Sequence, residues 1–156
     1  MALQTVFNDI ELGDLLNVAN KKKIEGWRAV QVLCTNTEDG VDITYAFSKD
    51  DIVENYRVKA VTKDMEVPSL QGQFLGLFPF ENEAVDMFGV NVTGMVLDFA
   101  GQFYQLAQKE PMTIISPEQK AAREKAKKIA AAKAAKAAKA AKEAKAAAEE
   151  TGKDGE

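Results

Sequence analysis

Length, composition and charge exclude several classes of protein. The chain has 156 residues, a formal net charge of −4, one cysteine and no histidine. A single cysteine cannot form an internal disulfide or a thiolate zinc site, and the lack of histidine removes the usual general base and the commonest metal ligand. The sequence contains no apolar run long enough for a membrane span and no signal-peptide pattern. We therefore expect a protein of a reducing compartment that is soluble or peripherally held, without the residues that most hydrolases use.

The charge is divided unequally along the chain. Residues 1–117 carry 9 basic and 17 acidic side chains, a net charge of −8, whereas residues 118–156 carry 11 basic and 7 acidic ones, a net charge of +4. We expect residues 1–117 to form one α+β domain and residues 118–156 to form a separate tail. Because the two parts have opposite signs, the tail either binds an anionic surface or folds back on the domain.

The first predicted elements are one helix and three strands. Asn8 as an N-cap predicts a helix over residues 9–23, and three consecutive lysines at its end complement the helix dipole. Alternating apolar residues predict strands over 27–35, 41–47 and 56–60. The short loops between these strands predict an antiparallel meander with the helix on one face.

The next part of the chain is less regular. Residues 67–80 carry no charge but contain two prolines and two glycines, so we expect an irregular, largely covered segment with one short helical stretch. A helix is predicted over 80–88, ending at Gly89. A strand over 90–97 and a turn with a short amphipathic piece over 98–109 follow. The sequence thus predicts a small, mostly antiparallel sheet of three or four strands with helices on one face.

The tail has a different character. Residues 121–148 contain sixteen alanines, with lysines at three-residue intervals, which predicts a long exposed helix followed by a disordered end. An alternative function for the chain is therefore a small binding module that uses these lysines on nucleic acid or an anionic membrane. No aromatic residues lie among the lysines for base stacking, so we do not expect nucleic acid as a partner.

An acidic and aromatic segment occupies the middle of the chain. Residues 64–108 hold six carboxylates and six of the eight phenylalanines, but no lysine or arginine. Carboxylates buried among apolar side chains need partners. We expect the cations to come from Arg28, Arg57 and Lys59 or from another protein.

Three of these acids lie in the predicted helix over 80–88. Glu83 and Asp86 are three residues apart and share one helix face, while Glu81 points elsewhere. Without histidine or a nearby nucleophile, catalysis by this chain alone is not expected. The acids are instead expected to accept hydrogen bonds that fix a loop or a contact between subunits.

The same segment resembles a known signature. Its most specific part is Phe80-Glu81-Asn82-Glu83-Ala84-Val85-Asp86-Met87-Phe88-Gly89-Val90, preceded by Pro68-Ser69. It is similar to the signature of the thirty-kilodalton (30 kDa) subunit family of respiratory complex I, in which two acids flank an arginine. Asn82 stands where that family usually has arginine, which removes one charge-assisted contact.

The residues that follow look more like the short form of this family that is found in energy-converting, Ech-type nickel–iron hydrogenases. These residues are Gly94, Leu97-Asp98-Phe99, Gly101, Phe103-Tyr104 and Pro111-Met112. The globular part also ends before the long C-terminal segment with which the complex I version wraps its partner, and this favours the hydrogenase type over the quinone-reducing type.

The resemblance implies a non-catalytic subunit with no cofactor of its own. Such subunits dock on the large catalytic subunit, of the forty-nine-kilodalton or nickel–iron type, beside iron–sulfur subunits, and the nickel–iron centre and the iron–sulfur clusters lie in those partners. The chain would be cytoplasmic, held peripherally on the inner face of the cell membrane as part of the complex. Such complexes pass electrons from ferredoxin to protons and translocate ions. The implied interface consists of Phe78, Phe80, Glu81, Glu83, Asp86, Phe88 and Gly89, with Val90 as further apolar area.

Overall fold

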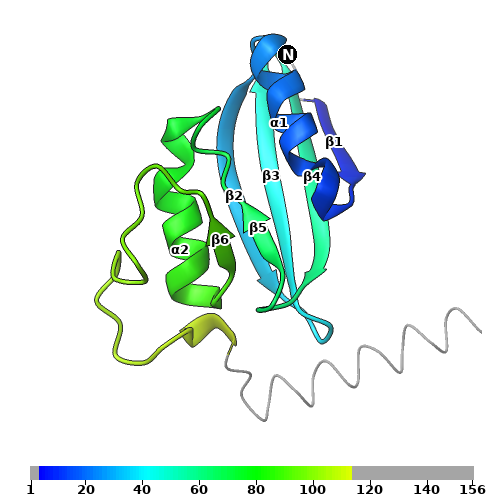
Figure 1. Cartoon of the computed structure of the whole chain (residues 1–156). Coiled ribbons are helices and arrows are strands. Elements are labelled where there is room, and N and C mark those ends of the chain that lie inside the picture. Colours follow the sequence, from blue (N-terminus) through cyan, green and yellow to red (C-terminus); the bar gives the residue numbers. More distant parts are fainter. Residues whose placement is uncertain (1–3, 114–156) are drawn as a thin grey trace, which may run out of the picture. The chain divides into compact units, whose positions relative to one another are not determined.

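The computed structural model describes residues 4–113, which form an α+β fold (Figure 1). Its main sheet has the strand order β1-β4-β3-β2. These strands are β1 (Gln4–Asp9), β2 (Arg28–Asn36), β3 (Val41–Lys49) and β4 (Ile52–Val61). β2, β3 and β4 form the predicted antiparallel meander, and β1 pairs with β4 in parallel. The predicted fold class is confirmed, while the tail predicted over 118–156 falls outside the described residues.

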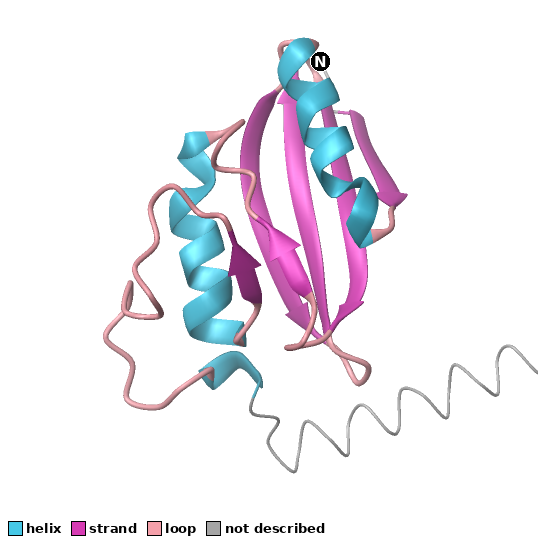
Figure 2. Cartoon of the chain, viewed as in Figure 1, coloured by secondary structure: helices cyan, strands magenta, loops and turns pink. Residues whose placement is uncertain are grey.

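Two helices and a small second sheet lie on one face of the main sheet (Figure 2). The remaining elements are the 3-10 turn η1 (Leu12–Asp14), α1 (Leu15–Ile24), β5 (Glu66–Pro68), the 3-10 turn η2 (Leu75–Leu77), α2 (Phe78–Phe88), β6 (Asn91–Thr93) and the 3-10 turn η3 (Pro111–Thr113). β5 and β6 pair in parallel. Neither helix of the described part is long and apolar enough to cross a membrane.

The hydrophobic core lies between the main sheet and the elements that cover it. Tyr45 and Phe47 of β3 are almost completely buried, together with Leu15 of α1, Val67 of β5 and Leu77 of η2. Every second residue of β3 faces this core, which is the alternation that the sequence shows. The alternation therefore predicted both the strand and its inward face.

The N-terminal segment differs from the prediction. Residues 4–9 form the strand β1, and the helix begins only at Leu15. Asn8 is not a helix cap, because it lies within β1. The backbone N–H of Ile10 continues the strand pairing by donating to the carbonyl oxygen of Arg57 at 2.9 Å. Pairing with β4 thus prevails over a capping signal that is purely local.

Ion pairs reinforce this pairing. Asp9 at the end of β1 accepts from Arg57 Nε at 2.8 Å and lies 2.6 Å from Lys59 Nζ. The hydrogen bond from Arg57, with that from Lys59, lowers the pKa of Asp9 to about 2. Because these charges lie at the surface, their contribution to stability is screened by salt.

The segment after α2 also differs from the prediction. The strand expected over 90–97 is limited to β6, and the stretch 98–109 forms neither a helix nor a strand. Gly94 has a φ of +75°, which turns the chain away from the strand direction. Beyond it, several backbone groups bond to buried side chains rather than to a neighbouring strand.

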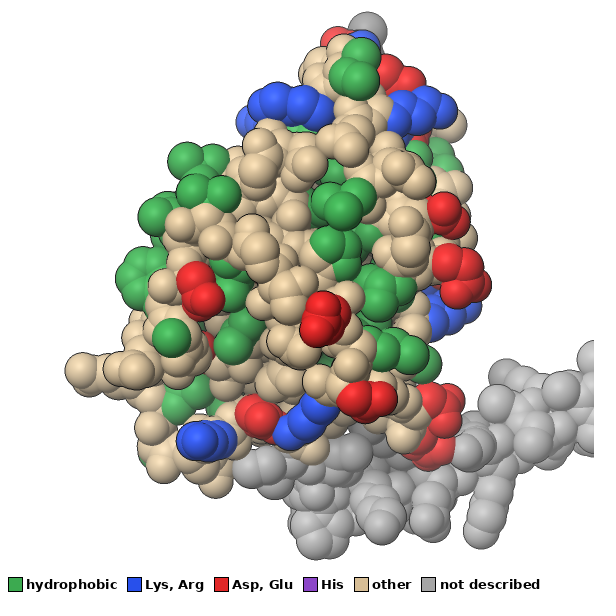
Figure 3. All heavy atoms as spheres, in the orientation of Figure 1, with side chains coloured by type: hydrophobic (Ala, Val, Ile, Leu, Met, Phe, Trp, Pro, Cys, Tyr) green, Lys and Arg blue, Asp and Glu red, His purple; other side chains and the backbone are tan. Residues whose placement is uncertain are grey.

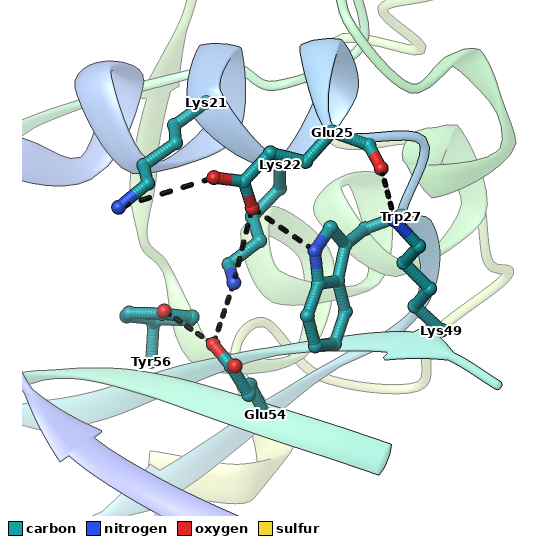
Figure 4. A network of polar contacts seen from close by, with 7 residues as sticks. All are labelled: Lys21, Lys22, Glu25, Trp27, Lys49, Glu54 and Tyr56. Carbon is teal, nitrogen blue, oxygen red and sulfur yellow. Dashed lines mark hydrogen bonds and ion pairs between the residues drawn. The ribbon is translucent and has the colours of Figure 1, made fainter. Parts of the chain in front are cut away.

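A buried lysine fastens α1 to β4 (Figure 4). Lys22 is 5% exposed, and its Nζ lies 2.6 Å from Glu54 Oε2 and 3.8 Å from the centroid of the Trp27 ring. The Tyr56 hydroxyl donates to the same Glu54 oxygen at 2.5 Å. Burial alone would raise the pKa of Glu54, but the hydrogen bonds from Lys22 and Tyr56 lower it below its ordinary value. All three lysines lie in the last turn of α1, as predicted, but Lys22 also has a role in the interior that the sequence did not indicate.

Replacing Lys22 with methionine should lower the free energy of unfolding by about 2 kcal/mol, since it leaves the Glu54 carboxylate part-buried without its cation. This loss of stability is smaller than that expected for breaking a fully buried ion pair, because the Glu54 side chain is 22% exposed. Urea denaturation monitored by Trp27 fluorescence measures it. Lys21→Met is the matched control, because Lys21 is 73% exposed, and it should change stability by less than about 0.5 kcal/mol. Equal effects of the two variants would contradict the prediction.

Candidate functional site at helix α2

The ends of α2 are set by Pro79 and Gly89, and the sequence predicted the second of them. Pro79 lies in the first turn, where its missing N–H costs no helical hydrogen bond. Gly89 ends the helix in the left-handed region at a φ of +66°. A Cβ on Gly89 would also lie 2.5 Å from the side-chain carboxyl carbon of Glu110. The predicted helix end is confirmed, and the glycine permits both the turn and the close approach of Glu110.

Glu81 joins α2 to the segment that precedes it. The side chain is 1% exposed. It accepts a hydrogen bond from the Ser69 hydroxyl at 2.5 Å and from the backbone N–H of Leu70 at 2.8 Å. Burial raises the pKa of Glu81 above its ordinary value, and the hydrogen bonds from Ser69 and Leu70 offset part of that rise. The Glu81 carboxylate therefore fixes the segment at Ser69 and Leu70 against α2.

Asn82 joins α2 to the segment that follows it. This side chain is also 1% exposed. Its Nδ2 donates to the carbonyl oxygens of Phe78 and Leu97, both at 2.8 Å, and its Oδ1 accepts from the N–H of Phe99 at 3.0 Å. Asn82, which stands where the 30 kDa subunit signature usually has arginine, thus makes three hydrogen bonds within the chain.

Two more buried polar side chains hold the same loop. Gln71 Oε1 accepts from the N–H of Leu97 at 2.8 Å, and Asp86 Oδ2 accepts from the N–H of Tyr104 at 2.7 Å. The Tyr104 hydroxyl reaches Glu83 at 3.4 Å, which is a weak contact. Glu83 and Asp86 are therefore brought together at Tyr104, as their shared helix face predicts, while Glu81 points to the opposite side.

The acids of residues 64–108 form no ion pair with any lysine or arginine among residues 4–113. Arg57 and Lys59 pair with Asp9 instead. Of the two expected sources of cations, the N-terminal half therefore supplies none to these acids within residues 4–113. Hydrogen-bond donors take the place of cations at the buried positions, and other members of the group are exposed to water. N–H and hydroxyl groups can satisfy a buried carboxylate without a neighbouring charge.

The loop after β6 exposes a group of apolar side chains, which we call the 96–104 surface. It consists of Val96, Leu97, Phe99 and Tyr104, which are 61%, 41%, 45% and 40% exposed. Beneath them, the Phe103 ring contacts the rings of Phe99 and Tyr104 at centroid distances of 5.0 and 4.9 Å. Figure 3 shows hydrophobic side chains along the side of the molecule where α2 and this loop lie. The apolar area is thus held in place from below by aromatic contacts and buried amides.

The predicted interface residues lie on α2 and at its end, outside the 96–104 surface. Phe78, Phe80 and Phe88 are half-buried, and Phe80 and Phe88 pack against the core. Phe78 supports the loop through an edge contact with Phe103 at 6.3 Å. The role of these residues in a contact with another subunit stays a prediction.

Sequence reasoning missed Gln71 and the structural role of Asn82. The available signal for Gln71 was its place as a polar residue next to the apolar Leu70 inside an uncharged segment. For Asn82 the signal was its place between two acids of the signature. Within residues 4–113 there is no group of three histidine, cysteine, aspartate or glutamate side chains that could hold a metal ion.

Comparisons with known proteins agree with this fold. A chain in the structure of the membrane-bound sulfane sulfur reductase, an archaeal respiratory membrane complex, superposes with a TM-score of 0.60 at 10% sequence identity, covering 69% of this chain and 67% of that one. At this identity the likeness concerns the fold alone. No protein of curated function matches the sequence significantly. The sequence profile of the family described as "Respiratory-chain NADH dehydrogenase, 30 Kd subunit" matches residues 9–96, more than half of the chain. The chain belongs to this family.

Proposed function

We propose that this chain is a non-catalytic subunit of a membrane-associated oxidoreductase complex and that it docks on the large catalytic subunit. The hydrogenase type is favoured by the residues from Gly94 onward. In this proposal the chain holds no cofactor, and the nickel–iron centre and iron–sulfur clusters belong to partner subunits. The chain would be bound peripherally at the inner face of the membrane. Its membership of a family of respiratory-complex subunits supports the proposal.

The observation that carries this proposal is the fixed 96–104 surface. A flexible apolar loop would lose conformational entropy on binding, whereas a loop already held in one conformation loses much less. Hydrogen bonds between the loop backbone and the side chains of Gln71, Asn82 and Asp86 provide this rigidity. Exposed apolar side chains that are grouped and rigid are typical of a protein contact.

The same contacts give new roles to the acids of the signature. Glu81 binds the segment before α2, and Asp86 binds the segment after it. Asp86 therefore acts through the loop conformation, whereas Glu81 fixes the segment that carries Gln71, and the contact area comes from the loop itself. Glu83 lies at the edge of this area beside Tyr104.

The proposal is tested by affinity purification of the tagged full chain from native membranes in mild detergent, with mass-spectrometric identification of the associated proteins. We expect a large subunit of the nickel–iron type and iron–sulfur subunits. The double variant Val96→Asp/Leu97→Asp should reduce their recovery at least tenfold, because charges would be placed on the apolar surface. Ile24→Asp is the matched control, since Ile24 is 86% exposed on α1, and it should have no effect. Recovery of the wild-type chain without partners would refute the proposal.

A further inference from the structure

A pocket of about 440 Å³ lies beside the 96–104 surface, between the C-terminal half of α2 and the segment that follows Phe99. Tyr104 belongs to both the surface and the pocket wall. The wall also includes Asp86, Gly101, Lys109 and Glu110. The pocket therefore continues the candidate docking area and adds an acidic group to it.

Asp86 has an unused hydrogen-bond acceptor at this pocket. The residue is 5% exposed, and its Oδ2 accepts from the N–H of Tyr104. Its Oδ1 is buried and has no hydrogen-bond partner among residues 4–113. A buried carboxylate oxygen without a donor is unfavourable, and native structures rarely leave one so.

The Ala100–Gly101 turn lies next to this oxygen. Gly101 has no side chain, and a Cβ there would lie 3.9 Å from Asp86 Oδ1. Both residues of the turn have positive φ, 51° at Ala100 and 74° at Gly101, and this conformation is strained for an alanine. Because Oδ1 is buried, a donor in the pocket can reach it only if this turn is displaced.

We propose that this pocket receives an arginine side chain of the large partner protein, whose guanidinium donates to Asp86 Oδ1. The inference rests on the proposed function, which supplies the partner. A guanidinium matches a carboxylate with planar donors and tolerates partial burial better than an ammonium. A metal ion is a poorer occupant, because the described residues contain no group of three acidic, histidine or cysteine ligands. Lys109 lines the pocket but forms no ion pair with Asp86 among the described residues.

The pocket is tested first in the full-length chain alone. Methylguanidinium chloride is titrated against the ¹⁵N-labelled chain, and the amide signals of Gly101 and Tyr104 are followed by NMR. In the wild type and in Lys109→Met they should shift and saturate, whereas in Asp86→Asn the saturating shift should be lost. Asp86→Asn keeps an acceptor for the Tyr104 N–H. Before methylguanidinium is added, the loop amide signals of this variant should therefore match those of the wild type, which shows that the loop is intact. Absence of a saturating shift in the wild type overturns the inference, and so does a shift that appears only in Lys109→Met.

The second test is made in the complex. With Asp86→Asn, recovery of the large partner protein should fall about tenfold, and Asp86→Glu should restore part of it because the charge returns. Asp64→Asn makes the same change at an exposed residue outside the pocket and should have no effect. Full recovery with Asp86→Asn would overturn the inference while the proposed function stands. If the wild type binds methylguanidinium but recovers no partner, the proposed function fails and the cation site remains.

Discussion

Replacement of Asn82 by leucine is expected to lower the free energy of unfolding by about 3 kcal/mol, because each buried polar group left without a partner costs on the order of 1–3 kcal/mol. The substitution keeps a similar volume but removes two donors and one acceptor. The carbonyl oxygens of Phe78 and Leu97 and the N–H of Phe99 would each lose a hydrogen bond. Urea denaturation followed by circular dichroism measures the loss.

The control is Asn91→Leu. Asn91 is exposed at the start of β6, and its replacement should change stability by less than about 0.5 kcal/mol. The Asn82 variant should also let the amide of Phe99 exchange with solvent faster, since its hydrogen bond is lost while the helix remains. Unchanged exchange at Phe99, or a loss of stability no larger than that of Asn91→Leu, would show that Asn82 does not hold the loop.

The elements that the sequence predicted are those whose signals are local. The meander of β2, β3 and β4 follows from alternation along each strand, in which the side chains of β3 face the core in turn. The end of the helix α2 follows from Gly89, while its start at Phe78 lies two residues before the predicted one. Both kinds of signal act within a few residues, so no knowledge of tertiary contacts is needed.

The errors concern features that depend on distant partners. β1 is an edge strand that pairs on one side with β4, whose residues lie far along the chain. Until that pairing is known, the residues around Asn8 are as consistent with a helix start as with a strand. Lys22 appears in sequence as one of three similar lysines, and only the position of Glu54 and Trp27 makes it an interior residue.

The same reasoning applies to the candidate site. Acids and aromatic residues without cations correctly marked residues 64–108 as unusual, but the nature of their partners could not be derived from composition. Glu81 and Asp86 use N–H and hydroxyl donors that lie 11 to 18 positions away in the sequence. The exposed side of the site is a loop without regular structure, and its conformation depends on these contacts.

Replacement of Glu81 is the second change that we expect to cause a large loss of stability. Glu81→Leu should lower the free energy of unfolding by about 3 kcal/mol at neutral pH, because the Ser69 hydroxyl and the N–H of Leu70 would be left buried without an acceptor. Glu81→Gln keeps an acceptor for the N–H and removes the charge. It should therefore be much less destabilising than the leucine variant. Chemical denaturation of the three proteins at one pH provides the comparison.

The dependence on pH separates the charge of Glu81 from its hydrogen bonds. The pKa of Glu81 in the folded chain lies above the ordinary value of 4.5 because of burial. Between that value and the folded pKa, the folded state binds more protons than the unfolded state, so this group makes stability fall as pH rises through the window. The stabilising contribution of the protonated Glu81 is fully present below pH 4.5 and is completely lost above the folded pKa.

Glu81→Gln has no proton to bind, so its stability should fall less steeply than that of the wild type as pH rises above 4.5. Free energies of unfolding measured in urea at half-unit steps from about pH 4 to about pH 8 give the difference between the two curves. Glu66→Gln is the control, because Glu66 is exposed at the start of β5 and its removal should leave the slope unchanged. The contrary result would be a wild-type stability that rises with pH relative to that of Glu81→Gln across this window. It would mean that the pKa of Glu81 is lowered in the folded chain. The ionised carboxylate would then stabilise the fold, whereas burial with only partial compensation by its donors predicts the opposite.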